Sequence, residues 1–99
     1  MSEWTPAAKD EVERAIAHEM EESDISNWRH MLVEPFECTI ERFGGVEVAF
    51  VVAIGPERVV YFDDVEEDFG TAKVVAGRLE GAAAYGPLIV ALREAAAGR

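Results

Sequence analysis

The stretch that decides the fold is VEVAFVVAI at residues 46–54, followed by GPER at 55–58 and VVYF at 59–62. The first segment is apolar on both of its alternating faces, as is typical of a strand in the middle of a sheet. The glycine and proline after it are turn residues, which bring the next apolar segment back alongside. We therefore expect Val46–Ile54 to pair antiparallel with Val59–Asp63, and something must cover the second face of the central strand.

The residues before this pair indicate another strand. Phe36–Arg42 alternates between apolar and polar residues, and two glycines then turn the chain. A two-residue loop would mix Glu41 with Val48 on one face. We favour a three-residue loop over residues 43–45, because a slip of one residue moves every side chain to the opposite face. The favoured register pairs Ile40 with Val48, Cys38 with Phe50, Phe36 with Val52 and Glu41 with Glu47.

Helical patterns flank the strands. Thr5 and Pro6 are typical of a helix start, and apolar residues spaced by three or four continue the helix to about Glu22. Ser26 is placed to cap a short second helix over residues 27–32, which Pro35 ends. Residues 69–75 and 79–82 read as one or two further strands, and a last helix starts after residues 85–87. The sequence thus predicts a single α+β domain over residues 1–99, with an antiparallel sheet of three to five strands between an N-terminal and a C-terminal helix.

The composition argues against several classes of function. The chain has 20 acidic and 9 basic residues and a net charge of -11, which opposes binding to DNA, RNA or anionic lipid. The lone cysteine, Cys38, can form no internal disulfide, and this favours a reducing compartment. The first residues lack the apolar core of a signal peptide, and the longest apolar run, Val48–Ile54, is too short to span a membrane. We expect a cytoplasmic protein that binds neither nucleic acid nor membrane.

A cluster of carboxylates follows the third strand and consists of Asp63, Asp64, Glu66, Glu67 and Asp68. Its spacing does not fit a calcium-binding EF-hand, because Phe69 would replace the turn glycine and Val75 the bidentate glutamate. The cluster is therefore either a solvated loop or a surface that binds a basic partner. We predict that Glu37, Glu41 and Glu47 on the neighbouring strands extend this candidate partner-binding face.

A second candidate site surrounds Glu19, which interrupts the apolar stripe of the first helix. Its side chain either reaches out to water or faces a pocket that Trp28 and Tyr61 would help to line. Acid–base chemistry would need a second carboxylate nearby, with Glu19 or Glu41 as a member of the pair. The sequence gives no sign that such a pair converges.

The remaining reactive side chains carry no recognisable motif. His18 and His30 lack the spacing of zinc ligands, and Cys38 is expected to be buried against Phe50 rather than to act as a nucleophile. We predict no catalytic residue, no metal site and no cofactor.

Three functions remain open. The first is a non-enzymatic binding module, and in size and acidity the chain is similar to inhibitors of nucleases and toxins, including bacterial immunity proteins. This resemblance is one of composition and size, so it assigns no role to any residue. The second is a small-ligand-binding or hydrolytic domain with a pocket between the first helix and the sheet. The third, compatible with either, is a homodimer through a sheet face formed by Val51, Val60 and Phe62. We favour the first, a small acidic protein that engages a basic protein surface without catalysis.

Overall fold

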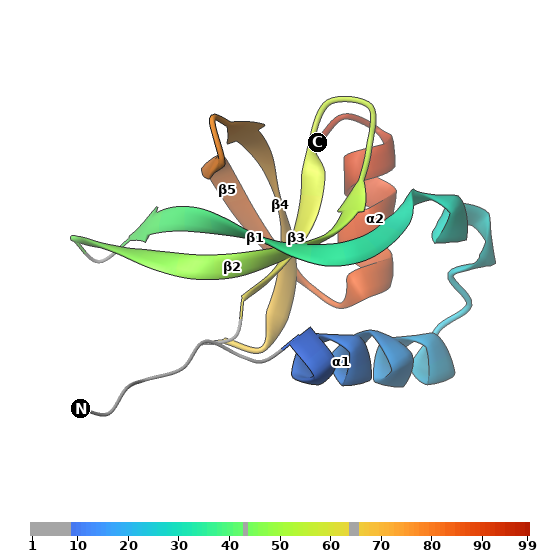
Figure 1. Ribbon diagram of the computed structural model, residues 1–99. Coiled ribbons are helices and arrows are strands. Elements are labelled where there is room, and N and C mark those ends of the chain that lie inside the picture. The colour runs from blue at the N-terminus through green and yellow to red at the C-terminus, as the bar shows by residue number, and fades with distance from the viewer. Residues whose placement is uncertain (1–8, 43, 64–65) are drawn as a thin grey trace.

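The computed structural model describes residues 9–42, 44–63 and 66–99. It has an α-helix at each end, a short 3-10 helix, and five strands (Figure 1). In chain order the elements are α1 (Lys9–Glu22), η1 (Ser26–Met31), β1 (Leu32–Arg42), β2 (Gly45–Ile54), β3 (Val59–Asp63), β4 (Asp68–Val75), β5 (Arg78–Gly86) and α2 (Leu88–Ala96). The predicted α+β class and both terminal helices are confirmed. The start of α1 proposed at Thr5 and Pro6 lies outside the described residues.

The five strands close into a small barrel rather than an open sheet, which corrects the predicted architecture. Consecutive strands pair antiparallel in the order β1-β2-β3-β4-β5. Because each turn reverses the chain and the number of strands is odd, β1 and β5 run in the same direction and close the barrel as a parallel pair. Register shifts in β1, β2 and β5 supply the local bends that closure needs.

The register predicted for β1 and β2 is wrong by one residue. Ile40 pairs with Glu47 and Cys38 with Ala49, so Glu41 lies opposite Val46 rather than Glu47. The prediction placed the larger apolar residues of both strands on one face, as in a flat sheet. In the barrel the inward face is crowded, and the smaller residues of β2 occupy it instead.

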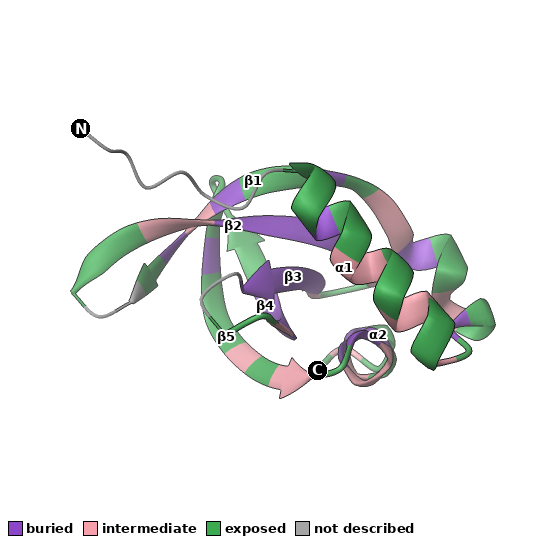
Figure 2. Cartoon of the chain, turned by 90° about the horizontal axis from the view of Figure 1, so that it is seen from below, coloured by how far each residue is buried: buried purple, intermediate pink, exposed green. Residues whose placement is uncertain are grey.

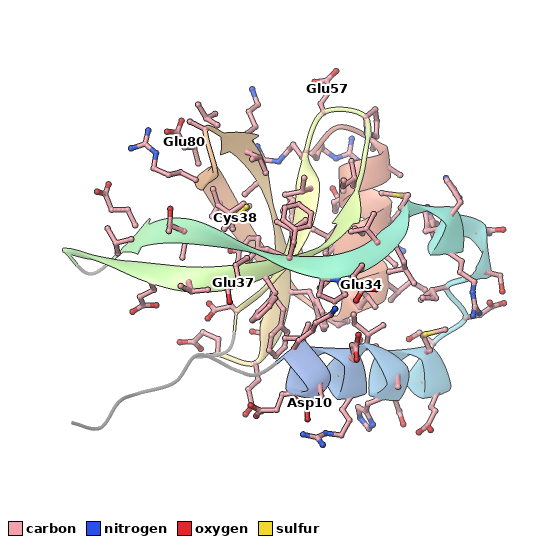
Figure 3. The ribbon with its side chains drawn as sticks, viewed as in Figure 1. Asp10, Glu34, Glu37, Cys38, Glu57 and Glu80 are labelled. Carbon is pink, nitrogen blue, oxygen red and sulfur yellow. The ribbon has the colours of Figure 1, made fainter. Side chains whose placement is uncertain are left out.

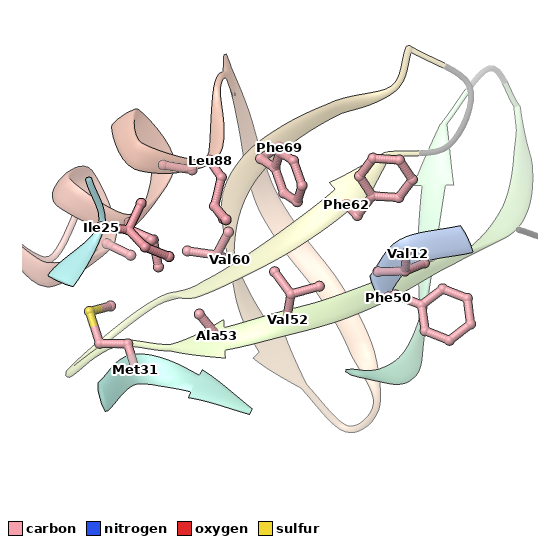
Figure 4. Close-up of a cluster of buried hydrophobic side chains, with 13 residues drawn as sticks. Val12, Ile25, Met31, Phe50, Val52, Ala53, Val60, Phe62, Phe69 and Leu88 are labelled. Carbon is pink, nitrogen blue, oxygen red and sulfur yellow. The ribbon is translucent and has the colours of Figure 1, made fainter. Parts of the chain in front are cut away.

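Two apolar clusters fill the molecule. One takes members from all five strands and from no helix, which identifies it as the barrel interior: Cys38, Ile40, Ala49, Val51, Val59, Tyr61, Ala72 and Leu79. The other joins α1, η1 and α2 to the outer face of β2, β3 and β4, and includes Val12, Phe50, Val52, Val60, Phe62, Phe69, Leu88 and Leu92 (Figure 4). The second face of the central strand is therefore covered by the chain itself.

This arrangement changes the face proposed for dimer formation. Val51 lies in the barrel interior, whereas Val60 and Phe62 lie under the helices, and their exposed fractions are 0%, 0% and 6%. The three side chains thus belong to two different buried clusters and form no exposed apolar face. Self-association as such stays a prediction.

The helices lie on one side of the barrel, with their polar faces outward (Figure 2). In α1, Val12 is fully buried and Ala15, Ile16 and Met20 are partly buried, as the spacing predicted. The second helix is a 3-10 turn, and Ser26 does not cap it with its side chain but bonds to Asp24 instead. Neither α1 nor α2, nor any other helix in the described residues, has the length and apolar character needed to cross a membrane.

Candidate functional site

Four carboxylates surround a hollow at the place where β1 and β5 separate. Glu41 comes from β1, Asp63 from the end of β3, Glu66 from the segment that follows it, and Glu80 from β5. The hollow has a volume of about 660 Å³. The structure thus brings together three of the acidic residues that the sequence assigned to partner binding, and adds Glu80, which sequence reasoning missed.

The floor of this hollow is the barrel interior. Ile40, Tyr61 and Leu79 line it, and all three belong to the interior cluster. Tyr61 lies opposite Gly70 in the β3–β4 register, and a methyl group on Gly70 would approach the tyrosine hydroxyl to 2.9 Å. The glycine therefore leaves room for the ring to lie in the barrel. The hollow combines an apolar floor with an acidic rim, a combination suited to a cationic group on an aliphatic stem.

The short closing pair explains why the hollow exists. Within the part of the chain that the structure describes, two residue pairs are in register between β1 and β5, Thr39 with Arg78 and Ile40 with Leu79. Two residues later, Gly81 adopts a positive φ of 64°, which a residue with a side chain rarely adopts. The β4–β5 register shifts at the same place, as at a bulge, so β5 bends after the closing pair.

The four carboxylates differ in their surroundings. Asp63 is only 6% exposed, and the backbone N–H of Glu66 approaches its Oδ1 at 3.4 Å. Glu41 and Glu66 are exposed. Glu80 is exposed and forms an ion pair of 2.8 Å with Arg78, which also lies in solvent. An exposed pair of this kind contributes about 0–1 kcal/mol, so a cation bound in the hollow can compete with Arg78.

A second arginine supports the hollow from its far side. Arg58 donates from Nε to Thr71 Oγ1 at 3.1 Å and from a terminal nitrogen to the Thr71 carbonyl at 3.0 Å. It also donates to the carbonyl of Gly81, which lines the hollow. This guanidinium ties the β2–β3 loop to β4 and β5, so it has a structural role that the sequence did not reveal.

The other predicted partner-binding residues lie elsewhere. Glu67 lines a different hollow, Asp68 is half-buried opposite Asp63, and Glu47 is half-buried opposite Ile40. Glu37 is exposed opposite Phe50, and Figure 3 shows it well away from Glu80. Asp64 lies outside the described residues. The same view places Asp10 and Glu57 at opposite ends of the molecule, so acidic side chains are not confined to the hollow.

The predicted pocket around Glu19, Trp28 and Tyr61 is divided. Glu19 lines a hollow of about 370 Å³ between α1 and the strands. Phe62 and Phe69 also line this hollow, and the centroids of their rings are 5.1 Å apart. Glu19 Oε1 accepts a hydrogen bond of 2.9 Å from the backbone N–H of Leu88, the first residue of α2. Trp28 packs on the helix-side core, and Tyr61 lies inside the barrel. Glu19 thus caps a helix, which explains its position within an apolar stripe.

The remaining reactive groups do not form a catalytic arrangement within residues 9–42, 44–63 and 66–99. Cys38 is buried in the barrel, and burial raises the pKa of its thiol. His18 and His30 are exposed and far apart in the sequence. No group of three or more His, Cys, Asp or Glu side chains among these residues is arranged to hold a metal ion.

Comparison of the chain with protein-family models, with curated proteins and with solved structures found no match. Its function must therefore be argued from its own residues.

Proposed function

We propose that this chain is a non-catalytic binding protein that engages a basic surface of a partner protein through the hollow between β1 and β5. The observation that carries the proposal is the convergence of Glu41, Asp63, Glu66 and Glu80 around one hollow with an apolar floor. Carboxylates arranged in this way attract cationic partners over several ångströms and speed their association.

The other two hollows are less suited to bind a basic partner, because their acidic side chains are accompanied by basic ones or already have a hydrogen-bond or ion-pair partner. The hollow between α1 and the strands is lined by Arg14 and His18 as well as by carboxylates, and Glu19 there already caps α2. The groove between α1 and β1 is lined by Glu34, which is paired with Lys9. Among the described residues, no basic side chain lines the hollow between β1 and β5 itself, although Arg78 pairs with Glu80 and Arg58 donates to the Gly81 carbonyl at its edge. A small-ligand or hydrolytic site beside α1 is accordingly the second choice.

The spacing of the carboxylates favours an organic cation over a metal ion. They come from four separate segments and do not form a group of metal-ligand geometry within the described residues. A guanidinium or ammonium group does not require closely spaced ligands, since several acidic neighbours can share its charge. The aliphatic part of the arginine or lysine side chain would pack on Tyr61 and Leu79.

The test compares two triple variants that change the net charge equally. One carries Glu41→Gln, Glu66→Gln and Glu80→Gln at the hollow. The control carries Glu13→Gln, Glu21→Gln and Glu22→Gln on the exposed face of α1. Binding of two folded basic probe proteins, lysozyme and cytochrome c, is measured by titration calorimetry over a series of salt concentrations. All six side chains are exposed, so both variants should keep the fold, which circular dichroism checks.

We expect the hollow variant to weaken binding about tenfold, which corresponds to about 1.4 kcal/mol, and the control variant to weaken it less than about threefold. Added salt should weaken binding by the parent chain. If both variants lose affinity equally, general charge is responsible and the hollow is not the site. If neither probe binds at low salt, or salt has no effect, the binding proposal itself fails.

A further inference from the structure

The edge of β5 beyond the closing pair is unoccupied by any strand that the structure describes. Arg78 and Leu79 pair with β1, whereas from Glu80 onward β5 pairs on its other side with β4 alone. The segment that follows Gly81 consists of small residues up to Tyr85, and Ala82 and Ala84 are exposed. A strand edge of this kind offers backbone N–H and C=O groups to another extended chain.

The matching edge of β1 carries a proline, which the free edge of β5 lacks. Pro35 has no backbone N–H to donate, and the β1 register shifts between Leu32 and Phe36. Helix α1 also contacts this part of β1, and Lys9 pairs with Glu34 there. Proline, bulges and covering helices are the usual protections of a strand edge. The register of β5 with β4 also shifts in this segment, and α2 contacts β5, but from Ala82 to Gly86 the strand has no proline and no charged side chain.

The free edge and the acidic hollow are parts of one surface. Gly81, Ala82 and Ala84 of β5 line the hollow together with Glu41, Asp63, Glu66 and Glu80. A chain that paired with this edge would lie directly beside these carboxylates. Their charge selects a basic segment over an acidic one, and it disfavours a second copy of this chain, whose net charge is -11.

We infer that the edge of β5 takes up an extended basic segment of the partner as an added strand, with a lysine or arginine side chain placed in the hollow. This inference rests on the proposed function, which it refines from a charged surface to a defined mode of binding. Gly86 has a positive φ of 87°, and the register with β4 shifts within this segment. The four residues from Ala82 to Tyr85 therefore span at most about 13 Å at roughly 3.3 Å per residue, enough to pair with about three or four residues of the partner. The backbone pairing supplies affinity, and the hollow supplies selectivity for a cationic side chain.

The experiment uses an octapeptide of alternating arginine and valine and two N-methylated forms of it. One form is methylated at the backbone nitrogens of the arginines and the other at those of the valines, so charge and composition are equal. In an added strand, the N–H groups of alternate residues point to the same edge. Methylation of the set that faces β5 should therefore weaken binding about tenfold, whereas methylation of the other set should change it less than about threefold.

Hydrogen exchange of the full chain locates the peptide. We expect the unmodified peptide to slow exchange of backbone amides within residues 82–86 and to leave residues 32–38 of β1 unchanged. Equal binding of the two methylated forms, or protection confined to other segments, would overturn strand addition. An acidic peptide of alternating glutamate and valine should not bind, and binding by that peptide would equally overturn it.

These results separate the two proposals. If both methylated peptides bind like the parent, and the hollow variant with Glu41→Gln, Glu66→Gln and Glu80→Gln still weakens binding, the acidic site stands and strand addition fails. If that variant binds all three peptides as tightly as the parent chain does, the hollow is not the binding site, and both proposals fail.

Discussion

A methyl group on Gly70 would meet its neighbours more closely than one on any other glycine that the structure describes, and replacement of Gly70 by alanine tests the packing of the candidate site. An added methyl group would lie 2.9 Å from the Tyr61 hydroxyl oxygen and 3.0 Å from Tyr61 Cε1, and closer still to the Ala83 carbonyl oxygen. Contacts of this kind cannot be kept, so β5 or the Tyr61 ring must move. Tyr61 is only 3% exposed, and the hollow that it lines is the space into which its ring could be displaced.

The cost of Gly70→Ala follows from these contacts. Overpacking of a dense interior costs about 1–3 kcal/mol. We therefore expect the free energy of unfolding to fall by about 1–3 kcal/mol in urea titrations followed by circular dichroism. The melting temperature should fall by roughly 4–24 °C, since 1 kcal/mol corresponds to about 4–8 °C in a domain of this size.

Gly45→Ala is the matched control. Gly45 also lies in a strand, but a methyl group there has no neighbour within 4 Å, and its φ is not in the left-handed region. The control should leave stability within about 0.5 kcal/mol of the parent or raise it slightly. A Gly70→Ala protein as stable as the parent, or equal losses in both variants, would refute the packing of Tyr61 against Gly70 and β5.

Three further substitutions test other contacts. Glu19→Ala should lower the free energy of unfolding by about 1 kcal/mol, because it removes the acceptor for the Leu88 N–H, and Glu19→Gln should cost less, because it keeps an oxygen there. Arg58→Ala should lower the free energy of unfolding in urea by about 2 kcal/mol, because the fully buried Thr71 loses a charged hydrogen-bond donor. Arg58→Lys should restore less than half of that free energy, because an ammonium group cannot reproduce the fork of the guanidinium. Burial raises the pKa of the Cys38 thiol, so as pH rises above the ordinary value of 9.0 the thiol ionises in the unfolded chain before it does in the folded one. The free energy of unfolding therefore falls as pH rises through this range. Melting temperatures measured from pH 8 upward should fall less steeply with pH in Cys38→Ala than in the parent chain.

Alternation in the sequence was enough to predict the strands but not their closure. The third strand was predicted at Val59–Asp63 and lies there, and the second begins one residue before its predicted start. Closure depends on two parallel pairs between Thr39–Ile40 and Arg78–Leu79, which no local pattern marks. In a barrel of five consecutive antiparallel strands, the first and the last run in the same direction. Recognition of the full fifth strand would therefore have allowed a parallel closing pair to be inferred.

The fifth strand was underestimated because its glycines were read only as a weakness. Gly81 permits a positive φ at the bulge, and β5 continues beyond it to Gly86. The predicted fifth strand included Glu80, but an open sheet does not bring its first and fifth strands together, so nothing placed Glu80 beside Glu41. Had the closed barrel been predicted from the sequence, Glu80 would have been placed beside Glu41.

The acidic cluster shows a different limit of sequence reasoning. Residues that are adjacent in the chain were treated as one face, but Asp63 and Glu66 line one hollow and Glu67 another. The direction of each side chain depends on the turn between β3 and β4. For Glu19, the sequence identified the anomaly correctly, yet its partner, the N–H of Leu88, lies 69 residues further along the chain.

Solubility alone does not account for where these carboxylates lie. It explains exposed acids such as Glu57 at the tip of a loop, because charge there costs little. It does not by itself explain Asp63, which is only 6% exposed and lines the same hollow as Glu41, Glu66 and Glu80, because a charged group is more costly at a buried position than at the surface. A barrel of five strands must close with a parallel pair, and here that pair is short, so the interior opens beside an unpaired edge. The proposed binding of a basic partner gives these positions a reason, because such a partner would add opposite charge beside the hollow.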